Sequence, residues 1–493
     1  MNSLRNLHSV CRFSLRTLST KEQTKPAFNF KLAGGVSEAI ASGKLKRRHH
    51  PGSLGVGTVT LPDKLNQAVL TYLSSTEYSP KHLENDGKIL STRLWSRHKP
   101  LEDDQLRQKI AAIEAKIVEK ETIDLDAPEM REEVRKRLLD SRMSKMHERM
   151  KREIYNWKPF QYDKYMSAVY MLARLVPDYA ALVKILSEIR SRDPAFVPLA
   201  MLDFGSGVGS GMWALDGVWA DLCKEAVCVD ASPDMNNLAD TLLRGGDPEN
   251  PRQVRGGGTF FRQFLPMSDA LRYNLVLSSR SLLELPDMDT RLKIIDILWR
   301  KTSGYLVIVE AGTSAGFRIV QEARDYVLNL TQTTGEEEVT CGDSHIFSPC
   351  PHDKICQRFN FSRIPLCNFS VNYKPLTLTK NQNPTSDKFS YVIIKRGARQ
   401  QNHQEEWPRL IQQPLLRKRH AICRTCTSYG RLTELISTKR RHGSEIYRVC
   451  KYSNWGDRLP IVLPEPTEIP ELDQSEDDSS ENDESEQKKE ILH

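Results

Sequence analysis

The sequence lacks any long apolar run. None of its 493 residues lies in a stretch that approaches the roughly 20 apolar residues needed to span a bilayer. We therefore predict a protein without a membrane span. With 39% hydrophobic and 27% charged residues, the chain is long enough to form two domains with full cores.

Acidic residues are missing from the first twenty positions. This segment carries Arg5, Arg12 and Arg16 together with several serines, and apolar residues are spaced between them. It also lacks the continuous apolar core of a secretory signal, so we interpret residues 1–20 as a mitochondrial transit peptide that directs the protein to the matrix. The alternative is a merely disordered basic N-terminus.

Acidic residues are concentrated instead at the other end of the chain. Twelve of them lie between Glu465 and Glu490, against only Lys488 and Lys489, and we predict an acidic disordered tail over residues 464–493. Because the whole chain has a net charge of +7, the part before this tail sums to +17. A basic body suggests a polyanionic partner such as RNA, although charge runs are often only solvated surface.

The N-terminal third divides into two regions by periodicity. Residues 21–62 are basic and lack sustained periodicity, so we predict a disordered arm that either follows phosphates or is a plain linker. Over residues 63–197, apolar residues recur at spacings of three and four, which predicts a helical domain. Its last two helices, divided by Pro177, are expected to pack directly on the sheet that follows.

Strands and helices alternate over residues 198–340. This alternation predicts an α/β fold with a doubly wound, mostly parallel sheet, here a Rossmann-like core. Residues 341–463 contain most of the cysteines and several short β-like pieces, among them 445–452. They predict a metal-cluster region and a small C-terminal β module.

A glycine-rich turn follows the first predicted strand of this core. Asp203 precedes Gly205, Gly207 and Gly209, and Asp230 ends the next apolar run. The glycines let the backbone turn tightly near a ligand, and a carboxylate at Asp230 can accept both hydroxyls of a ribose. Asp203 can hold the loop or the amine of the ligand. This combination resembles the S-adenosylmethionine (SAM) cradle of class I methyltransferases; the alternative is a glycine turn of another α/β protein.

The sequence lacks the residues that such enzymes use on the methyl acceptor. Base-amine methyltransferases present an Asn/Asp-Pro-Pro-aromatic turn after the fourth strand, whereas this chain has Ser278-Ser279-Arg280-Ser281. Cytosine carbon methylation needs a cysteine nucleophile, and neither Cys223 nor Cys228 is a convincing candidate. We therefore predict no catalytic residue and favour a non-catalytic RNA-binding protein over an rRNA methyltransferase.

The ten cysteines do not form a ferredoxin run, and a disulfide framework is not expected in the reducing matrix. Cys350, Cys356, Cys367, Cys423 and Cys426 group in a loop-rich region, where thiolates favour soft metals. Only Cys423 and Cys426 have the C-x-x-C spacing of a zinc knuckle. From spacing alone, an iron–sulfur cluster, a structural zinc site and a set of buried thiols all remain open.

Five segments between residues 162 and 460 resemble the mitochondrial ribosomal small-subunit assembly factors related to methyltransferase-like protein 17. They are Leu202–Gly209 followed by Trp213-Ala214, Val309–Thr313 with Gly316–Arg318, Cys350–His352, Phe389–Val392, and Tyr447-Arg448 leading to Trp455–Asp457. Several such matches in the right order make the resemblance specific.

The resemblance implies a SAM-binding fold and a [4Fe-4S] cluster held by four cysteines. The matching positions are Cys350, Cys356, Cys367 and Cys426, with Cys423 as the substitute for the fourth ligand. The resemblance also implies association with small-subunit rRNA and ribosomal proteins during assembly in the mitochondrion. A SAM-dependent rRNA methyltransferase stays the alternative function.

Overall fold

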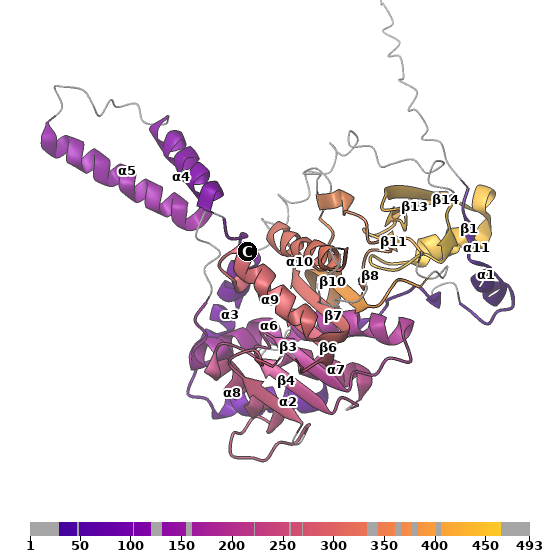
Figure 1. The fold of residues 1–493 in the computed structure, drawn as a ribbon, viewed down its shortest axis with the longest axis horizontal. Coiled ribbons are helices and arrows are strands. Elements are labelled where there is room, and N and C mark those ends of the chain that lie inside the picture. The colour runs from indigo at the N-terminus through magenta and orange to yellow at the C-terminus, as the bar shows by residue number, and fades with distance from the viewer. Residues whose placement is uncertain are drawn as a thin grey trace, which may run out of the picture.

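The structure is a computed structural model, and it describes residues 29–464 with short gaps (Figure 1). The gaps are residues 47–48, 102, 120–130, 154–159, 221, 256–257, 269, 333–343, 360–365, 377–382 and 401–405. The predicted transit peptide over residues 1–20 lies outside the described residues, as does all but the first residue of the predicted acidic tail. No helix among the described residues is both long enough and apolar enough to cross a membrane.

The described residues form a central sheet of nine strands with the order β2-β9-β10-β7-β6-β3-β4-β5, and β8 pairs with β10. Strands β3 to β7 are parallel to their neighbours, while β10 enters antiparallel beside β7. This order confirms the predicted class I methyltransferase-like α/β fold. The bounds are β2 Thr58–Val59, β3 Ala200–Phe204, β4 Glu225–Val229, β5 Thr259–Arg262, β6 Tyr273–Ser279, β7 Thr302–Ala311, β8 Ser344–Ser348, β9 Phe369–Tyr373 and β10 Thr385–Arg396.

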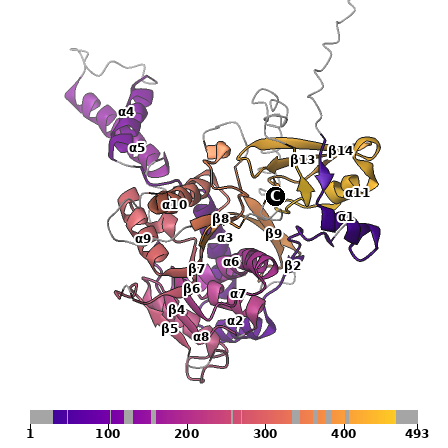
Figure 2. The ribbon, with the colours of Figure 1, turned by 45° about the vertical axis from the view of Figure 1, so that its right-hand side comes forward.

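Helices cover both faces of this sheet (Figures 1 and 2). One face packs against α6 (Lys164–Arg192), α7 (Ser210–Trp219) and α8 (Pro233–Leu243). The other face packs against α9 (Met288–Arg300) and α10 (Ser314–Gln332). Because both faces are covered, the central strands are continuous apolar runs, as parallel sheets require.

The helix α6 corrects one prediction. Pro177 does not divide two helices; it lies inside one continuous helix of 29 residues. Proline in a helix interior removes one backbone hydrogen bond and disfavours the helix. Here Val176, Pro177 and Asp178 are all buried against the sheet, so packing on both sides of the proline outweighs that cost.

The helices α2 (Asp63–Ser75) and α3 (Pro80–Trp95) pack on α8 and α6. Leu65 and Leu83 belong to the same hydrophobic core as the sheet, so these helices form an outer layer of the core rather than a separate helical domain. In contrast, α4 (Asp103–Val118) and α5 (Glu132–Glu153) form a hairpin that extends away from the body (Figure 1). The hairpin has a small core of its own around Ile113 and Ile117.

The predicted C-terminal β module is present as a four-stranded sheet. Its elements are β11 Arg409–Leu410, β12 Leu415–Leu416, β13 His420–Cys426, β14 Leu432–Thr438 and the helix α11 Lys439–Tyr452. The prediction of a strand over 445–452 was wrong, because this segment is helical. The Thr438 side chain accepts a hydrogen bond from the amide of Arg441 and caps α11, which then kinks at Gly443.

The prediction of a disordered arm over residues 21–62 was wrong for the part that the structure describes. Strand β1 (Lys31–Leu32) pairs with β15 (Ile461–Val462), and α1 (Gly34–Ala41) follows. Phe30, Val36 and Ile40 are buried in the same cluster as Trp407 of the β module. These partners lie far away along the sequence, so local periodicity could not reveal the contact.

Candidate functional site

The glycine loop joins β3 to α7 at the carboxyl edge of the sheet. Gly205, Gly207 and Gly209 all have positive φ angles, of 69°, 52° and 86°. Residues with a Cβ rarely adopt this conformation, so the loop geometry depends on the glycines. The amide groups at the start of α7 lie directly after the loop, as they do where a helix N-terminus faces an anionic or polar ligand.

The two predicted acidic residues lie on either side of this loop. Asp230 accepts hydrogen bonds from the amides of Gly207 and Ser232, both at 2.9 Å. Asp203 is buried under the start of α7, where a Cβ on Gly211 would come within 2.3 Å of its carboxylate. Burial and the nearby Asp230 raise the pKa of Asp203 to about 7. Asp230 therefore holds the loop, while Asp203 packs beneath the start of α7.

Other side chains come close to the glycines. A Cβ on Gly205 would lie 1.9 Å from Ser281 Oγ, and one on Gly207 would lie 3.6 Å from the ring of Tyr170. The hydroxyls of Ser206, Ser278 and Ser279 are buried, and they have no hydrogen-bond partner within the protein. Hydroxyls without partners and a cradle without Cβ atoms are compatible with SAM, which the loop glycines and Asp230 would hold.

An ionic network fills the acceptor side of the cradle, beyond β6. Arg280 donates to Asp178 at 3.2 Å and to Asp387 at 2.6 Å. Arg174 bonds the same two carboxylates, and Tyr170 donates to Asp178 at 3.1 Å. Arg280 also has a positive φ of 61°. The position that holds the acceptor amine in base-amine methyltransferases is thus occupied by a neutralised cluster of two arginines and two aspartates.

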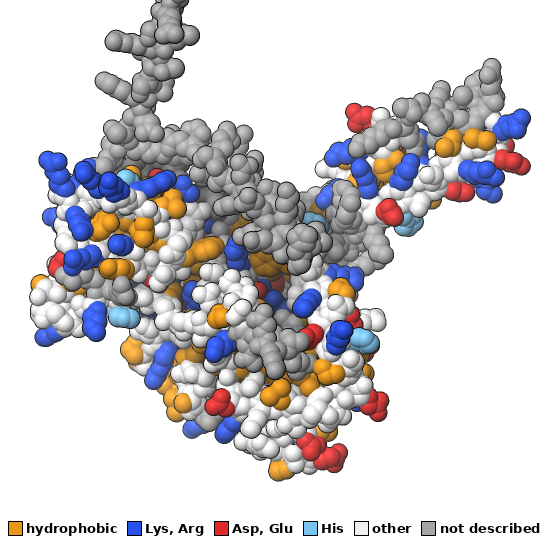
Figure 3. Space-filling model, turned by 180° about the vertical axis from the view of Figure 1, so that it is seen from behind, with side chains coloured by type: hydrophobic (Ala, Val, Ile, Leu, Met, Phe, Trp, Pro, Cys, Tyr) orange, Lys and Arg blue, Asp and Glu red, His pale blue; other side chains and the backbone are white. Residues whose placement is uncertain are grey.

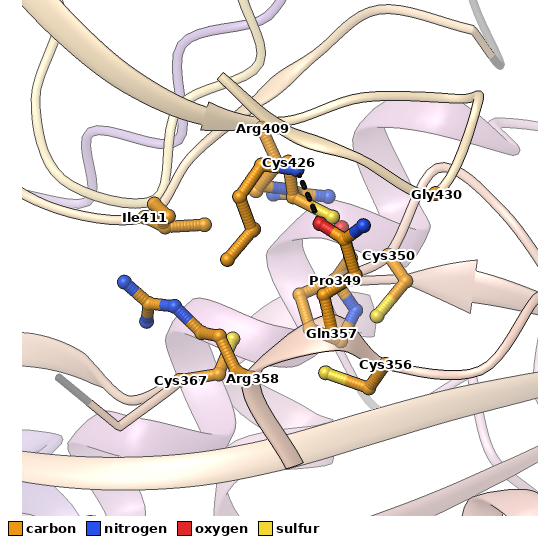
Figure 4. Close-up of a pocket in the computed structure, with 11 residues that line it drawn as sticks. Pro349, Cys350, Cys356, Gln357, Arg358, Cys367, Arg409, Ile411, Cys426 and Gly430 are labelled. Atoms are coloured by element: carbon orange, nitrogen blue, oxygen red, sulfur yellow. Dashed lines mark hydrogen bonds between the residues drawn. The ribbon is translucent and has the colours of Figure 1, made fainter. Parts of the chain in front are cut away.

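The four predicted cysteine ligands line one pocket between the sheet and the β module (Figure 4). Cys350 follows β8, Cys356 lies in the next loop, Cys367 precedes β9, and Cys426 ends β13. Among the described residues, no three Cys, His, Asp or Glu side chains converge so that they could hold a single metal ion. The cysteines instead surround a space. Four thiols around one pocket are compatible with a cluster in which each thiolate binds a different iron.

Three buried arginines fix the loops that carry these cysteines. Arg409 donates to the carbonyl of Pro349, Arg358 to that of Leu366, and Arg324 to those of His352 and Lys354. Each carbonyl lies within two residues of a cysteine. The arginines also place positive charge around the pocket, where four thiolates would carry negative charge.

The pKa values of the thiols show how they behave without a ligand. Burial and the neighbouring thiols raise the pKa of Cys356 to about 12. Burial raises the pKa of Cys367 to about 11, although Arg358 opposes this shift. The pKa of Cys426 is also raised, by burial and by the three other cysteines. Burial in this pocket therefore favours neutral thiols, and metal binding would release protons.

The structure separates Cys426 from its substitute. Cys423 lies on the opposite face of β13, packed in the core of the module near the carbonyl of Cys450, at 3.8 Å. His352 lies with its Nε2 atom 3.3 Å from Cys426 Sγ. Sequence reasoning missed this contact and the three arginines. Arg324 and Arg409 are far from the cysteines along the sequence, and His352 and Arg358, although close to them, carry no spacing signal.

Comparisons with known proteins extend this description. Residues 164–460 match the family described as mitochondrial small ribosomal subunit Rsm22. The chain is 38% identical over 425 residues to the human ribosome assembly protein METTL17, mitochondrial, covering 85% of this chain and 87% of that protein. It is 28% identical over 319 residues to the Rsm22-cox11 tandem protein 2 of Schizosaccharomyces pombe, covering 57% of this chain and 41% of that protein.

Solved structures show a distant likeness. The magnesium protoporphyrin IX methyltransferase from Synechocystis PCC 6803 with bound SAM is 13% identical, with a TM-score of 0.28. The match covers 53% of this chain and 96% of that chain. The fold assignment rests on the strand order described above.

Proposed function

The chain belongs to the mitochondrial small ribosomal subunit Rsm22 family, and from this premise we propose that it is a mitochondrial small-subunit assembly factor that binds rRNA without methylating it. Its similarity to the human ribosome assembly protein METTL17 supports the assembly role and the mitochondrial location. We propose further that a [4Fe-4S] cluster stabilises the protein.

The observation that carries this proposal is the position of the cysteine pocket. Three of its cysteines lie on the loops of the main sheet, while Cys426 belongs to the β module. Polar contacts cross the join at this point, among them the buried ion pair of Arg409 with Glu188 on α6 and the bond from the Leu432 amide to Gln357, at 2.9 Å. A cluster bound by all four thiolates would add covalent links between the two parts, and its binding free energy would become folding free energy.

The cradle supports a role for the fold without methyl transfer. SAM would be held by the loop glycines with Asp203 and Asp230, and when bound it would supply a methyl group. The space beyond the end of β6 is filled by Arg280 and its two carboxylate partners. A methyl acceptor at this position would have to displace this buried network. The alternative, a SAM-dependent rRNA methyltransferase, requires such a displacement.

An anaerobic purification tests the cluster. We expect brown protein with about four irons and four sulfides per chain, and loss of both in the Cys350→Ser variant. Cys423→Ser is the matched control, because this buried thiol of the same module lies outside the pocket, and it should keep its iron. Zinc without visible absorption, or equal iron loss in both variants, would contradict the cluster assignment.

A second experiment separates assembly from catalysis. In cells that lack the chain, we expect a Gly207→Trp variant, whose bulky side chain fills the cradle, to restore the level of mature small subunits. The Cys350→Ser variant should fail to do so. Loss of a specific rRNA methyl group in both the deletion and the Gly207→Trp cells, with restoration by the wild type, would establish the enzyme instead.

A further inference from the structure

The β module carries an unusual excess of positive charge. Between Arg409 and Val462 the sequence has twelve Lys or Arg residues against three Asp or Glu residues. Two of the acidic residues have partners: Glu434 bonds Arg424 at 2.8 Å, and Asp457 accepts from the amide of Asn454 in the module and from that of Leu54 in the N-terminal segment. The third, Glu445, is half-buried on α11.

Strand pairing brings two basic runs of this module together. The first run, Arg417–Arg419, forms the tip of the hairpin between β12 and β13, closed by a bond from the Arg417 amide to the His420 carbonyl at 2.9 Å. The second run, Lys439–Arg441, begins α11. Because His420 pairs with Thr438, the residue after the first run lies opposite the residue before the second.

All six side chains of these runs are exposed. Figure 3 shows Lys and Arg side chains gathered along the outer edge of the module, with few acidic side chains among them. By comparison, the basic residues of α5 alternate with five acidic residues, Glu132, Glu133, Asp140, Glu148 and Glu153. Among the described residues, the strongest uninterrupted positive surface that we find therefore belongs to the module. We call Arg417–Arg419 together with Lys439–Arg441 the basic edge.

We propose that the basic edge binds the phosphate backbone of folded rRNA and is the principal RNA contact of the module. This inference rests on the proposed function and names the surface that carries it out. Two adjacent runs of cations without intervening carboxylates suit a backbone with one negative charge per nucleotide, since each neutralised phosphate releases counterions. Such contacts fix position and orientation rather than read sequence.

The basic edge and the cysteine pocket lie on the same strand pair. Strand β13 begins with His420 at the basic edge and ends with Cys426 at the pocket. A cluster that fixes Cys426 would thereby fix the orientation of the edge relative to the main sheet. The RNA contact would then depend on cluster binding through one short strand.

Salt-dependent RNA binding tests the inference. The probe is a transcript of small-subunit rRNA, and the protein is the full chain purified with its iron. Removing three charges as Arg417→Gln/Lys418→Gln/Arg419→Gln should lower the affinity at least about tenfold and reduce the slope of log Kd against log salt by about 2 to 3. Lys439→Gln/Arg440→Gln should act in the same direction with a slope change of about 1 to 2.

The matched control removes the same charge elsewhere. Lys64, Lys81 and Lys88 are exposed on α2 and α3, so Lys64→Gln/Lys81→Gln/Lys88→Gln leaves the net charge equal to that of the first variant. We expect less than about a threefold loss of affinity for this control. Iron content and melting temperature should match the wild type in all three variants.

Three outcomes would overturn the inference. They are equal losses in the control and the hairpin-tip variant, no loss in either module variant, and unchanged RNA binding with lost binding to a purified acidic ribosomal protein. Each applies only if the wild type binds the rRNA. A wild-type chain that holds its iron and binds no small-subunit rRNA would instead overturn the proposed function.

Discussion

The glycine cradle and the cysteine pocket differ in how completely the protein satisfies them. In the cradle, both oxygens of Asp230 accept backbone amides, and Arg280 bonds two carboxylates. In the pocket, four thiols lie close to one another, and burial and mutual repulsion raise the pKa values of Cys356, Cys367 and Cys426. The charged groups Asp230 and Arg280 find partners within the protein, although the hydroxyls of Ser206, Ser278 and Ser279 do not, whereas the raised pKa values of the thiols disfavour their charged form.

This difference indicates which site the fold depends on. A buried site whose charges are paired needs no ligand to compensate them, while a buried site that needs deprotonated ligands couples metal binding to folding. We expect the cradle to stay folded without a ligand. We expect the contact between the main sheet and the β module at the pocket to depend on the bound metal. Each prediction below changes one of the two regions, or their surroundings, and asks whether the other responds.

The largest expected effect is that of metal removal. Treating the purified protein with an oxidant and a chelator should release the β module, because the thiols return to their neutral, buried and uncoordinated state. Limited proteolysis should cut between residues 409 and 464 at least about a hundredfold faster, equivalent to about 3 kcal/mol. The region from α6 to α10 should resist cleavage as before. An equal increase in cleavage of both regions would show that metal removal does not act specifically on the β module.

The next effect concerns the ionic network of the cradle. Asp178→Ala leaves Arg174 and Arg280 buried with one carboxylate partner fewer, which should lower the free energy of unfolding by about 3 to 5 kcal/mol. Iron content should stay unchanged, as measured beside the chemical unfolding curve. The control is Asp86→Ala, which removes a half-buried carboxylate bonded to Tyr165. It should lower the free energy of unfolding by about 1 kcal/mol or less. Iron loss in Asp178→Ala would show that the two regions are coupled.

Sequence patterns predicted the repetitive parts of the fold well and the long-range contacts poorly. The strands and helices predicted to alternate over residues 198–340 are present, because each of them follows one local pattern. Segment 445–452 was misread, since buried Tyr447 and Val449 alternate as in a strand although they lie on α11. The pairing of β1 with β15 could not be predicted, because neither two-residue strand carries a signal of its own.

The candidate site shows the same difference between local motifs, which the sequence marks, and long-range contacts, which it does not. The glycine loop and the cysteines are local motifs, so the sequence marks them. The arginines that support the cysteine loops are not marked: Arg324 lies on α10 and Arg409 on β11, and they reach the pocket only after folding. The ionic network likewise joins α6, β6 and β10, and no single segment carries its pattern.

Two glycine variants of the cradle loop should lower the stability of the protein by different amounts. Gly205→Ala places a Cβ 1.9 Å from Ser281 Oγ, in addition to the strain of a positive φ, and should lower the free energy of unfolding by about 2 to 4 kcal/mol. Gly207→Ala meets nothing closer than Tyr170 at 3.6 Å and should cost only about 1 kcal/mol. Thermal unfolding monitored by circular dichroism gives both values. Equal costs would mean that the loop moves away from Ser281.

The smallest expected effect is on the pH dependence of stability and concerns His50. Its Nε2 atom bonds Ser453 of the β module at 2.9 Å. Burial, followed by the charge of Arg458, lowers the pKa of His50 to about 4. Because the folded state holds the neutral imidazole, this stability is present above the unfolded pKa of about 6.5 and is lost as the pH falls toward 4.

Between pH 7.5 and pH 5.5 the protein should lose about 1 kcal/mol of stability through this group. His50→Gln keeps a polar side chain of similar reach that does not titrate, so the difference between the two pH profiles isolates the histidine from the many carboxylates. If the profiles coincide, protonation of His50 is not coupled to folding. If they diverge while iron content stays constant over the same range, protonation of His50 weakens the contact of the N-terminal segment with the module independently of the cysteine pocket.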